Sequence, residues 1–309
     1  MKNLQLTYKP KENFIYRSNG VVKISILLSL FVQSFIFNHP FYLGVFFLNI
    51  LIIILFSDCW EEILIYFRFM LIISLFTFFI NIILYPEGTT IIFQISNDFP
   101  LLGGFKITFE TIISSLIIIF RLTLIFLIFG TFNLIINPDE IIQGLVKLKI
   151  PHSIVFIITL SLNFFPLILK DLEKIREIQQ CKGLELEKGN FLSKFKNNVK
   201  LILPLLTNSL ERSIQNAEAL EARAFDIKGK REYYQVIKIS FIDYIIIIFT
   251  ISSLIFQIYL SFQGFGNYLI YPTLSEVYLG NSGYFVLIFL SFSNFLIIGL
   301  LNLGDKIEK

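Results

Sequence analysis

The sequence has few of the residues that soluble domains and metal sites depend on. Only 16% of its 309 residues carry a charge, and Cys and His occur twice each. Cys59 and Cys181 lie far apart, which indicates neither a disulfide framework nor a zinc site. His39 and His152 have no Cys, Asp or Glu at ligand spacing. Each stands beside a proline, and we expect both to cap turns rather than to bind a metal ion.

Apolar residues are correspondingly abundant. Hydrophobic residues make up 55% of the chain, Phe alone contributes 36 residues, and the mean hydropathy is +0.73. A soluble globule of this length has too little interior for so much apolar side chain. Intrinsic disorder is excluded as well, because disordered chains have low hydrophobicity. The composition therefore predicts an all-α, polytopic helical membrane protein.

The apolar residues fall into segments that suit membrane spans, each of which needs roughly 20 residues. Residues 21–56 are too long for one span and are interrupted by Asn38-His39-Pro40, so we interpret them as a hairpin of two short helices. The six predicted spans are residues 21–37, 41–56, 63–85, 107–136, 241–262 and 284–303.

The basic residues predict the orientation. Sixteen of the 26 lie between residues 147 and 238, and five more precede or open the first span. By the positive-inside rule, both termini and the central segment are expected to be cytoplasmic. This divides the chain into a membrane domain of four helices (1–136), a cytoplasmic coupling-helix region (137–240) and a C-terminal transmembrane hairpin (241–309).

Residues 153–169 are apolar enough for a seventh span. Lys147 and Lys149 precede them and Lys170 follows, so a crossing would place one basic cluster outside. Asn163 and Pro166 would also need internal partners in lipid. We therefore expect a helix at the membrane boundary.

Arg121 lies near the middle of the fourth span, where a charge costs about 2.5–3.5 kcal/mol on insertion scales. It is either part of a substrate or proton path, or an arginine hydrogen-bonded to carbonyl groups inside the bundle. The second interpretation is favoured, since no acidic residue near mid-depth is available to pair with it.

The central segment carries the most distinctive pattern. Pro138 and the acids after it suit the first turn of a short helix. Residues 166–182 form a predicted amphipathic helix that ends at a glycine. Residues 191–224 form a second, with a kink or break expected at Pro204. Each helix ends in a basic residue flanked by small ones, in Cys181-Lys182-Gly183 and Ala222-Arg223-Ala224.

These features, taken in order, resemble the transmembrane T component of energy-coupling factor (ECF) transporters, the EcfT/CbiQ-like proteins. The likeness runs from about residue 104 to residue 225. It rests on Asn137-Pro138-Asp139-Glu140, Lys149-Ile150-Pro151, Asn163-Phe164-Phe165-Pro166, Ile178-Gln179-Gln180-Cys181-Lys182-Gly183, Leu203-Pro204-Leu205-Leu206 and Ala219-Leu220-Glu221-Ala222-Arg223-Ala224-Phe225.

The resemblance implies a scaffold in a prokaryotic plasma membrane that joins a substrate-binding S component to two cytoplasmic ABC ATPase subunits, for uptake of a vitamin or a transition-metal ion. The family's two Ala-Arg-Gly motifs dock on the ATPases, and Cys181-Lys182-Gly183 and Ala222-Arg223-Ala224 take their places here. Lys182 keeps the charge but lacks the planar fork of arginine. Ala224 lacks the easy access of glycine to the left-handed conformation. We expect Arg223 to matter more than Lys182.

Two other classes of function are considered. A self-contained channel or secondary carrier would use Arg121, Asn81, Thr123 and Asn133 along a pore, and would transport without ATP. An intramembrane enzyme would need an acid–base or metal constellation, and the sequence offers no candidate for one. We therefore expect no catalytic residue, no metal and no cofactor in this chain, with ATP bound by the partner subunits. The near balance of acids and bases in the central segment argues against a nucleic-acid partner.

Overall fold

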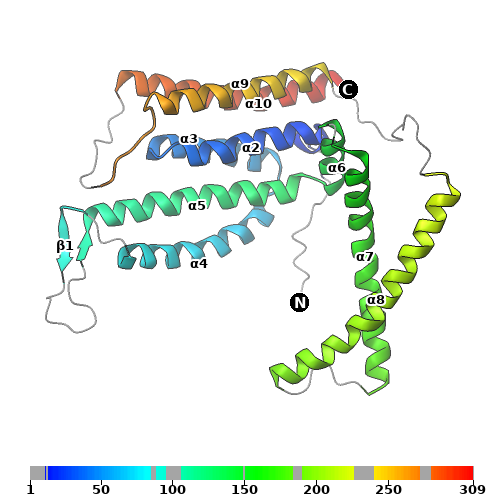
Figure 1. Ribbon diagram of the computed structural model, residues 1–309. Helices are drawn as coiled ribbons and strands as arrows, with labels where there is room; N and C mark the ends of the chain where they lie inside the picture. The colour runs from blue at the N-terminus through cyan, green and yellow to red at the C-terminus, as the bar shows by residue number, and fades with distance from the viewer. Residues whose placement is uncertain are drawn as a thin grey trace. The chain divides into compact units, whose positions relative to one another are not determined.

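The computed structural model describes residues 11, 13–84, 88–94, 106–148, 150–183, 190–225, 240–271 and 280–308. Lys149 and the predicted end of the third span at Tyr85 lie outside these residues. The described elements are helical apart from one small hairpin: α1 (Phe14–Arg17), α2 (Gly20–Ile36), α3 (Pro40–Phe56), α4 (Trp60–Leu84), β1 (Ile91–Gln94), β2 (Lys106–Thr108), α5 (Phe109–Ile135), α6 (Pro138–Lys147), α7 (His152–Cys181), α8 (Phe191–Ala222), α9 (Phe241–Phe262) and α10 (Asn281–Glu308) (Figure 1).

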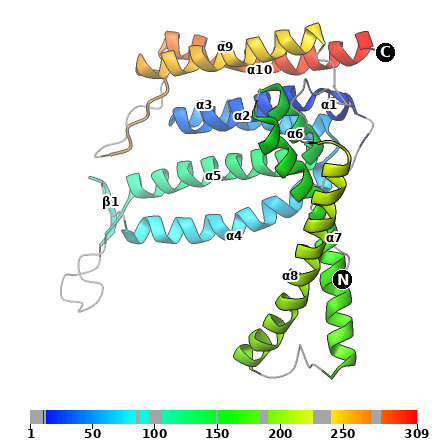
Figure 2. The ribbon, with the colours of Figure 1, turned by 45° about the vertical axis from the view of Figure 1, so that its right-hand side comes forward.

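The chain divides into two compact units, one formed by Met1–Gly144 with Ile237–Lys309 and the other by Leu145–Val236. The first unit is a bundle in which each of the six predicted spans forms one helix, and α9 has the predicted bounds. Figures 1 and 2 show the same order of layers, with α9 and α10 together, then α2 and α3, then α5, then α4. The fold is thus the predicted helical membrane bundle.

Length and composition mark five of the described helices as able to cross a membrane, namely α4, α5, α7, α9 and α10. Helices α2 and α3 are also apolar but have 17 residues each, so they are about 26 Å long. They form the short hairpin that the sequence predicts. Its turn is held by the loop after α9, where the carbonyl oxygen of Gly266 accepts from the backbone N–H groups of Asn38 and His39, both at 3.0 Å.

The two histidines differ in their roles. His39 is the N-cap of α3, and its Nδ1 accepts from the backbone N–H of Phe41 at 3.3 Å, which confirms the predicted cap. His152 is instead the first residue of α7, whose N-cap is Pro151, and the expected capping role is wrong there. Its ring packs edge-on against Phe225, with centroids 6.3 Å apart.

The antiparallel β1–β2 hairpin was not predicted. The fourth span was expected to begin at residue 107, but residues 106–108 pair as a strand and α5 begins at Phe109. The hairpin is fastened to α5 by Glu110. Its carboxylate oxygens accept from the backbone N–H and hydroxyl groups of Thr89 and Thr90, at 2.8–3.3 Å.

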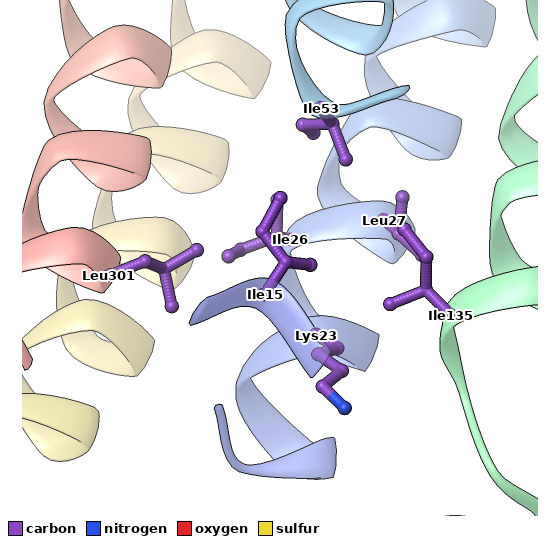
Figure 3. Close-up of a pocket in the computed structure, with 7 residues that line it drawn as sticks. All are labelled: Ile15, Lys23, Ile26, Leu27, Ile53, Ile135 and Leu301. Atoms are coloured by element: carbon purple, nitrogen blue, oxygen red, sulfur yellow. The ribbon is translucent and has the colours of Figure 1, made fainter. Parts of the chain in front are cut away.

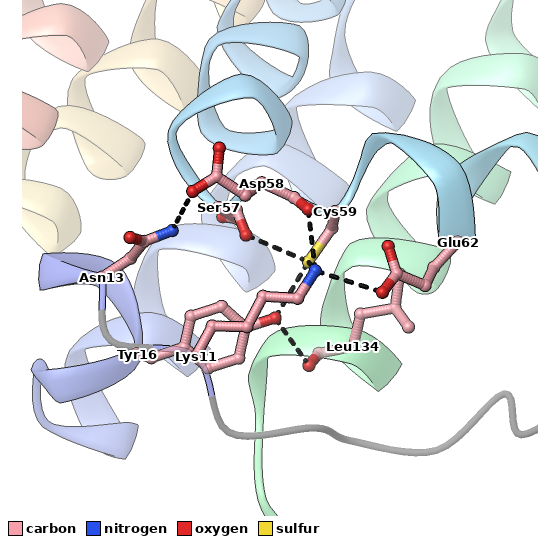
Figure 4. Close-up of polar contacts among 8 residues, drawn as sticks. All are labelled: Lys11, Asn13, Tyr16, Ser57, Asp58, Cys59, Glu62 and Leu134. Atoms are coloured by element: carbon pink, nitrogen blue, oxygen red, sulfur yellow. Dashed lines mark hydrogen bonds and ion pairs between the residues drawn. The ribbon is translucent and has the colours of Figure 1, made fainter.

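The N-terminal segment is tied to the turn between α3 and α4 (Figure 4). Lys11 Nζ forms an ion pair with Glu62 Oε1 at 3.1 Å, and the Tyr16 hydroxyl lies 2.9 Å from Cys59 Sγ. Burial by itself lowers the pKa of Lys11. The hydrogen bond and charge of Glu62, together with Cys59, raise the pKa by more than burial lowers it, so the pKa lies above its ordinary value. Lys11 therefore stays cationic at neutral pH and holds the segment in place.

The second unit is formed by α7 and α8, which cross (Figure 2). They run antiparallel, because positions rising along α7 meet positions falling along α8: Phe156 with Phe225, Asp171 with Arg212, and Ile175 with Leu201. The crossing is held by Ile175 and Leu201, which are 7% and 4% exposed, and by an Arg212–Asp171 ion pair of 2.7 Å.

Both helices are longer than the sequence suggests. The predicted boundary helix 153–169 and the predicted amphipathic helix 166–182 are one helix, α7, which continues through Pro166. Helix α8 likewise continues through Pro204, so it is not broken there. A proline removes only one helical hydrogen bond. At Pro204, Leu201 and Leu205 on either side both pack against α7, which stabilises the helix across the proline.

Candidate functional site: two basic helix ends

The first predicted motif forms the end of α7. Cys181 is the last helical residue, and Lys182 is the C-cap, with φ −78° and ψ 5°. Gly183 follows with φ +85°, and its N–H donates to Gln180 O at 2.9 Å. This is the left-handed ending that glycine favours at a helix C-terminus.

The second motif forms the end of α8 with a similar geometry. Ala222 is the last helical residue and Arg223 is the C-cap, with φ −88° and ψ 9°. Ala224 takes the left-handed conformation at φ +57°. Its N–H donates to Glu221 O at 2.8 Å, and the next N–H, that of Phe225, donates to Leu220 O at 3.0 Å. The two bonds complete a Schellman motif with alanine where glycine is usual.

The side chains of both motifs face solvent. All six residues, Cys181, Lys182, Gly183, Ala222, Arg223 and Ala224, are exposed. Among the described residues, no hydrogen bond or ion pair involves the side chain of Lys182 or Arg223. Each cation also lies where the carbonyl groups at the end of a helix concentrate partial negative charge, so its placement is favourable. Both cations are available to an acidic surface or to carbonyl groups of another protein.

The structure does not bring the two motifs together. Because α7 and α8 are antiparallel, their C-terminal ends point in opposite directions from the crossing. Lys182 lies seven residues beyond Ile175 on α7, about 10 Å along the axis, and Arg223 lies 22 residues beyond Leu201 on α8, about 33 Å. The arrangement is therefore two separate contact points rather than one site.

Phe225 fixes the second contact point, a role that the sequence did not reveal. Its ring packs on Phe156 near the start of α7, with centroids 4.6 Å apart. The end of α8 is therefore held against α7, and Arg223 is presented from a packed turn. The signal that could have found this contact is the position of Phe225 directly after the left-handed residue, where Schellman motifs place an apolar side chain.

The face of α8 opposite the crossing is apolar and exposed. Its members lie on one side of the helix and have exposures of 44–73%: Val199, Ile202, Leu203, Leu206, Leu210 and Ile214. The sequence predicted an amphipathic helix over residues 191–224, and the structure shows this exposed apolar face over residues 199–214. Exposed apolar stripes of this kind are typical of binding surfaces.

Two of the polar residues proposed for a pore, Arg121 and Thr123, form hydrogen bonds within the bundle instead. Arg121 Nη2 donates to Phe37 O at 3.2 Å and to Asn38 Oδ1 at 2.5 Å. This confirms the favoured interpretation, since the guanidinium holds the turn between α2 and α3. The Thr123 hydroxyl donates to Ile119 O, within its own helix, at 2.8 Å.

Comparison with known proteins places these features in context. The family model CbiQ, described as "Cobalt transport protein", matches residues 11–234, which include both motifs and end before α9. Several curated relatives carry the name "Energy-coupling factor transporter transmembrane protein EcfT". The Clostridium kluyveri protein is 30% identical over 253 residues, covering 77% of this chain and 89% of the relative. The Staphylococcus aureus protein is 26% identical over 268 residues, covering 83% and 96%.

The Bacillus subtilis protein is 30% identical over 174 residues, 53% of this chain. In that case the chain spans 63% of the relative, just under two thirds of its length.

Proposed function

Since this chain belongs to the CbiQ family of transport proteins, we propose that it is the transmembrane scaffold of an ECF-type ABC importer. In this proposal it couples ATP binding and hydrolysis in two cytoplasmic ATPase subunits to reorientation of a membrane S component. The transported substrate is a vitamin or a transition-metal ion bound by the S component. The relatives' name, which describes the transmembrane protein of an energy-coupling factor transporter, supports this assignment.

One observation carries the docking part of the proposal. Two helix ends of similar backbone geometry each present an exposed cation, and they lie at opposite ends of one crossed pair. Two equivalent contact points suit two ATPase subunits. A charge-assisted hydrogen bond from a basic side chain is about twice as strong as a neutral one, so Lys182 and Arg223 would supply both attraction and direction.

The proposed mechanism uses no bond chemistry in this chain. ATP binding brings the two ATPases together and displaces the helix ends anchored at Lys182 and Arg223. Because α7 and α8 are joined at a packed crossing, the displacement changes the arrangement of the pair. The exposed apolar stripe of α8 passes this change to the S component, which reorients and releases its substrate.

The proposed setting is a prokaryotic plasma membrane, in which the chain is a multi-pass protein. Both termini and the α7–α8 unit are assigned to the cytoplasm, where the basic residues concentrate. This side also holds ATP, which the partner subunits need. The chain itself is a non-catalytic subunit.

The experiment is co-expression of the chain with its candidate ATPases and S component, followed by co-purification and uptake. Arg223→Glu should weaken ATPase retention and lower uptake at least tenfold, and Lys182→Glu should have a smaller effect. Lys200→Glu, an exposed cation on α8 away from both ends, is the matched control and should stay within twofold. Undiminished retention and uptake in Arg223→Glu would contradict docking, and uptake by the purified chain alone would favour a carrier.

A further inference from the structure

This inference rests on the proposed coupling function and concerns how movement of α7 and α8 reaches the membrane bundle. The boundary between the two units falls after Gly144, inside α6. Only four residues, 148–151, separate the end of α6 from the start of α7. A displacement of α7 is therefore passed to α6, and it reaches the bundle only if α6 is held there.

A buried ion pair holds α6 to α2. Lys23 is 3% exposed, and its ammonium group donates to Glu140 Oε1 at 2.9 Å, to Glu140 Oε2 at 3.0 Å and to Tyr16 O at 2.8 Å. The ammonium has three donors, and all three are used. Both oxygens of the Glu140 carboxylate face the same cation, which fixes the position of this turn of α6.

The rest of the Lys23 side chain belongs to the apolar core. Figure 3 shows its stem beside a small apolar cavity, with the ammonium pointing away from it. The other side chains that line this cavity are Ile15, Ile26, Leu27, Ile53, Ile135 and Leu301. Among the described residues, Glu140 is the only charged partner of the ammonium. Loss of the partner destabilises a protein much more when the cation is buried than when it is exposed, because an uncompensated buried charge remains.

Two glycines bring α6 close enough for this pairing. A Cβ atom added at Gly20 would clash with Glu140 Cβ, so only glycine allows α2 to approach α6 there. One turn further along α6, Gly144 lies against Val21 and Ile24. Ile141 packs against the buried core of the bundle between these points. One face of α6 is thus seated on the first turns of α2.

We propose that Lys23 and Glu140 are positioning residues that form the joint between α6 and the membrane bundle. Because this joint fixes α6, a movement of α7 and α8 also moves the bundle. If α6 were not fixed, α6 would change its own position and the movement would not reach the bundle. Neither residue belongs to the two basic helix ends. The sequence showed Lys23 only as a cation that opens the first span and Glu140 only as an acid in a first helical turn.

The first test measures the joint in the full-length chain alone, in lipid nanodiscs. Lys23→Met with Glu140→Gln removes both charges together and leaves no uncompensated buried ion. Amide hydrogen exchange within α6 should become at least tenfold faster, while exchange in α8 stays unchanged. The matched control, Lys11→Met with Glu62→Gln, removes an ion pair of the same unit that does not touch α6, and should leave α6 exchange unchanged. Equal α6 exchange in wild type and the Lys23/Glu140 variant would overturn the proposal.

The second test measures coupling in the assembled transporter. The Lys23/Glu140 variant should retain its ATPases and hydrolyse ATP within twofold of wild type, while the ATP hydrolysed per substrate molecule taken up rises at least fivefold. An unchanged ratio, or a parallel loss of assembly, hydrolysis and uptake, would overturn the positioning role. Failure of the wild-type chain to retain any ATPase contradicts the proposed function instead, and the exchange experiment then still decides whether the joint exists.

Discussion

At the residue scale, Ala224 combines a functional position with an unfavourable backbone. It is one of two non-glycine residues with positive φ among those described, and the other is Asp58. A left-handed conformation costs an L-residue roughly 1–2 kcal/mol. The packing of Phe225 on Phe156 offsets this cost, and the same turn places Arg223 at the helix end.

Ala224→Gly should stabilise this turn by about 1 kcal/mol, because glycine adopts the left-handed conformation without a steric penalty. The exchange rate of the Phe225 amide, whose N–H bonds to Leu220 O, should fall about fivefold. The reciprocal change, Gly183→Ala, is the control. A Cβ there meets nothing within 4 Å, so only the backbone cost applies, and exchange at the end of α7 should quicken. Changes of the same sign in both variants would contradict this account.

Several residue-scale features could be predicted from the sequence, and others could not. The cap at His39 and the internal hydrogen bonds of Arg121 followed from a proline and from the absence of a mid-depth acid. The Lys23–Glu140 pair did not, because 117 residues separate its members and no local pattern links them.

At the element scale, the α7–α8 crossing determines where the two basic ends point. Its apolar core is small among the described residues, with Ile175 and Leu201 buried and Leu172 and Leu205 packed against them. A small core makes each contact important. It also suits a pair of helices whose arrangement must change during transport.

Leu201→Ala should destabilise the α7–α8 pair by about 2–4 kcal/mol, the usual cost of emptying a buried leucine site. Amide exchange in the middle of α8 would report it. Leu203→Ala is the matched control on the same helix turn, because Leu203 is 73% exposed, and its effect should stay below about 0.5 kcal/mol. Equal effects would mean that the crossing is packed through the other face of α8.

The Arg212–Asp171 ion pair should contribute less than Leu201 to the stability of the α7–α8 pair. Its side chains are 29% and 18% exposed, so a double-mutant cycle with alanine should give a coupling of roughly 1 kcal/mol that declines with added salt. Lys170→Ala, next to Asp171 in sequence, should show no coupling to Arg212. A coupling energy of zero at low salt would show that the pair does not hold the crossing.

The sequence predicted the helices that are marked by a long apolar run. It did not predict the elements that depend on contacts between residues far apart in the chain. The bounds of α9 could be read directly from the sequence. The β1–β2 hairpin could not, since its four- and three-residue strands are fastened by Glu110 and its contacts with Thr89 and Thr90. The continuity of α7 and α8 through prolines was missed because local propensity disfavours it.

At the scale of the whole molecule, the proposed function needs a lipid-embedded bundle and a helix pair, α7 and α8, on the cytoplasmic side. Six spans would place both termini on that same side. Helix α7 has the length and composition of a span, yet basic residues flank its apolar half.

The proposed topology predicts that Cys181 and residue 92 lie on opposite sides of the membrane. Cys181 is exposed and Cys59 is buried, so a membrane-impermeant maleimide should label only Cys181 in the native chain, and only from the cytoplasmic face of inverted vesicles. An Ile92→Cys, Cys181→Ser variant should label only from the outer face. Labelling of Cys181 from the outside would show that α7 crosses the membrane.

The docking of the two basic helix ends on ATPase subunits is the central claim, and Cys181, next to Lys182, reports on it directly. The measurement is the maleimide labelling rate of Cys181 in nanodiscs, with and without the ATPase pair, using labelling at residue 92 in the Ile92→Cys, Cys181→Ser variant as the reference. Labelling of Cys181 should be at least fivefold slower when the ATPases are bound, with no change at residue 92. An unchanged Cys181 rate in a complex that retains its ATPases would contradict this docking.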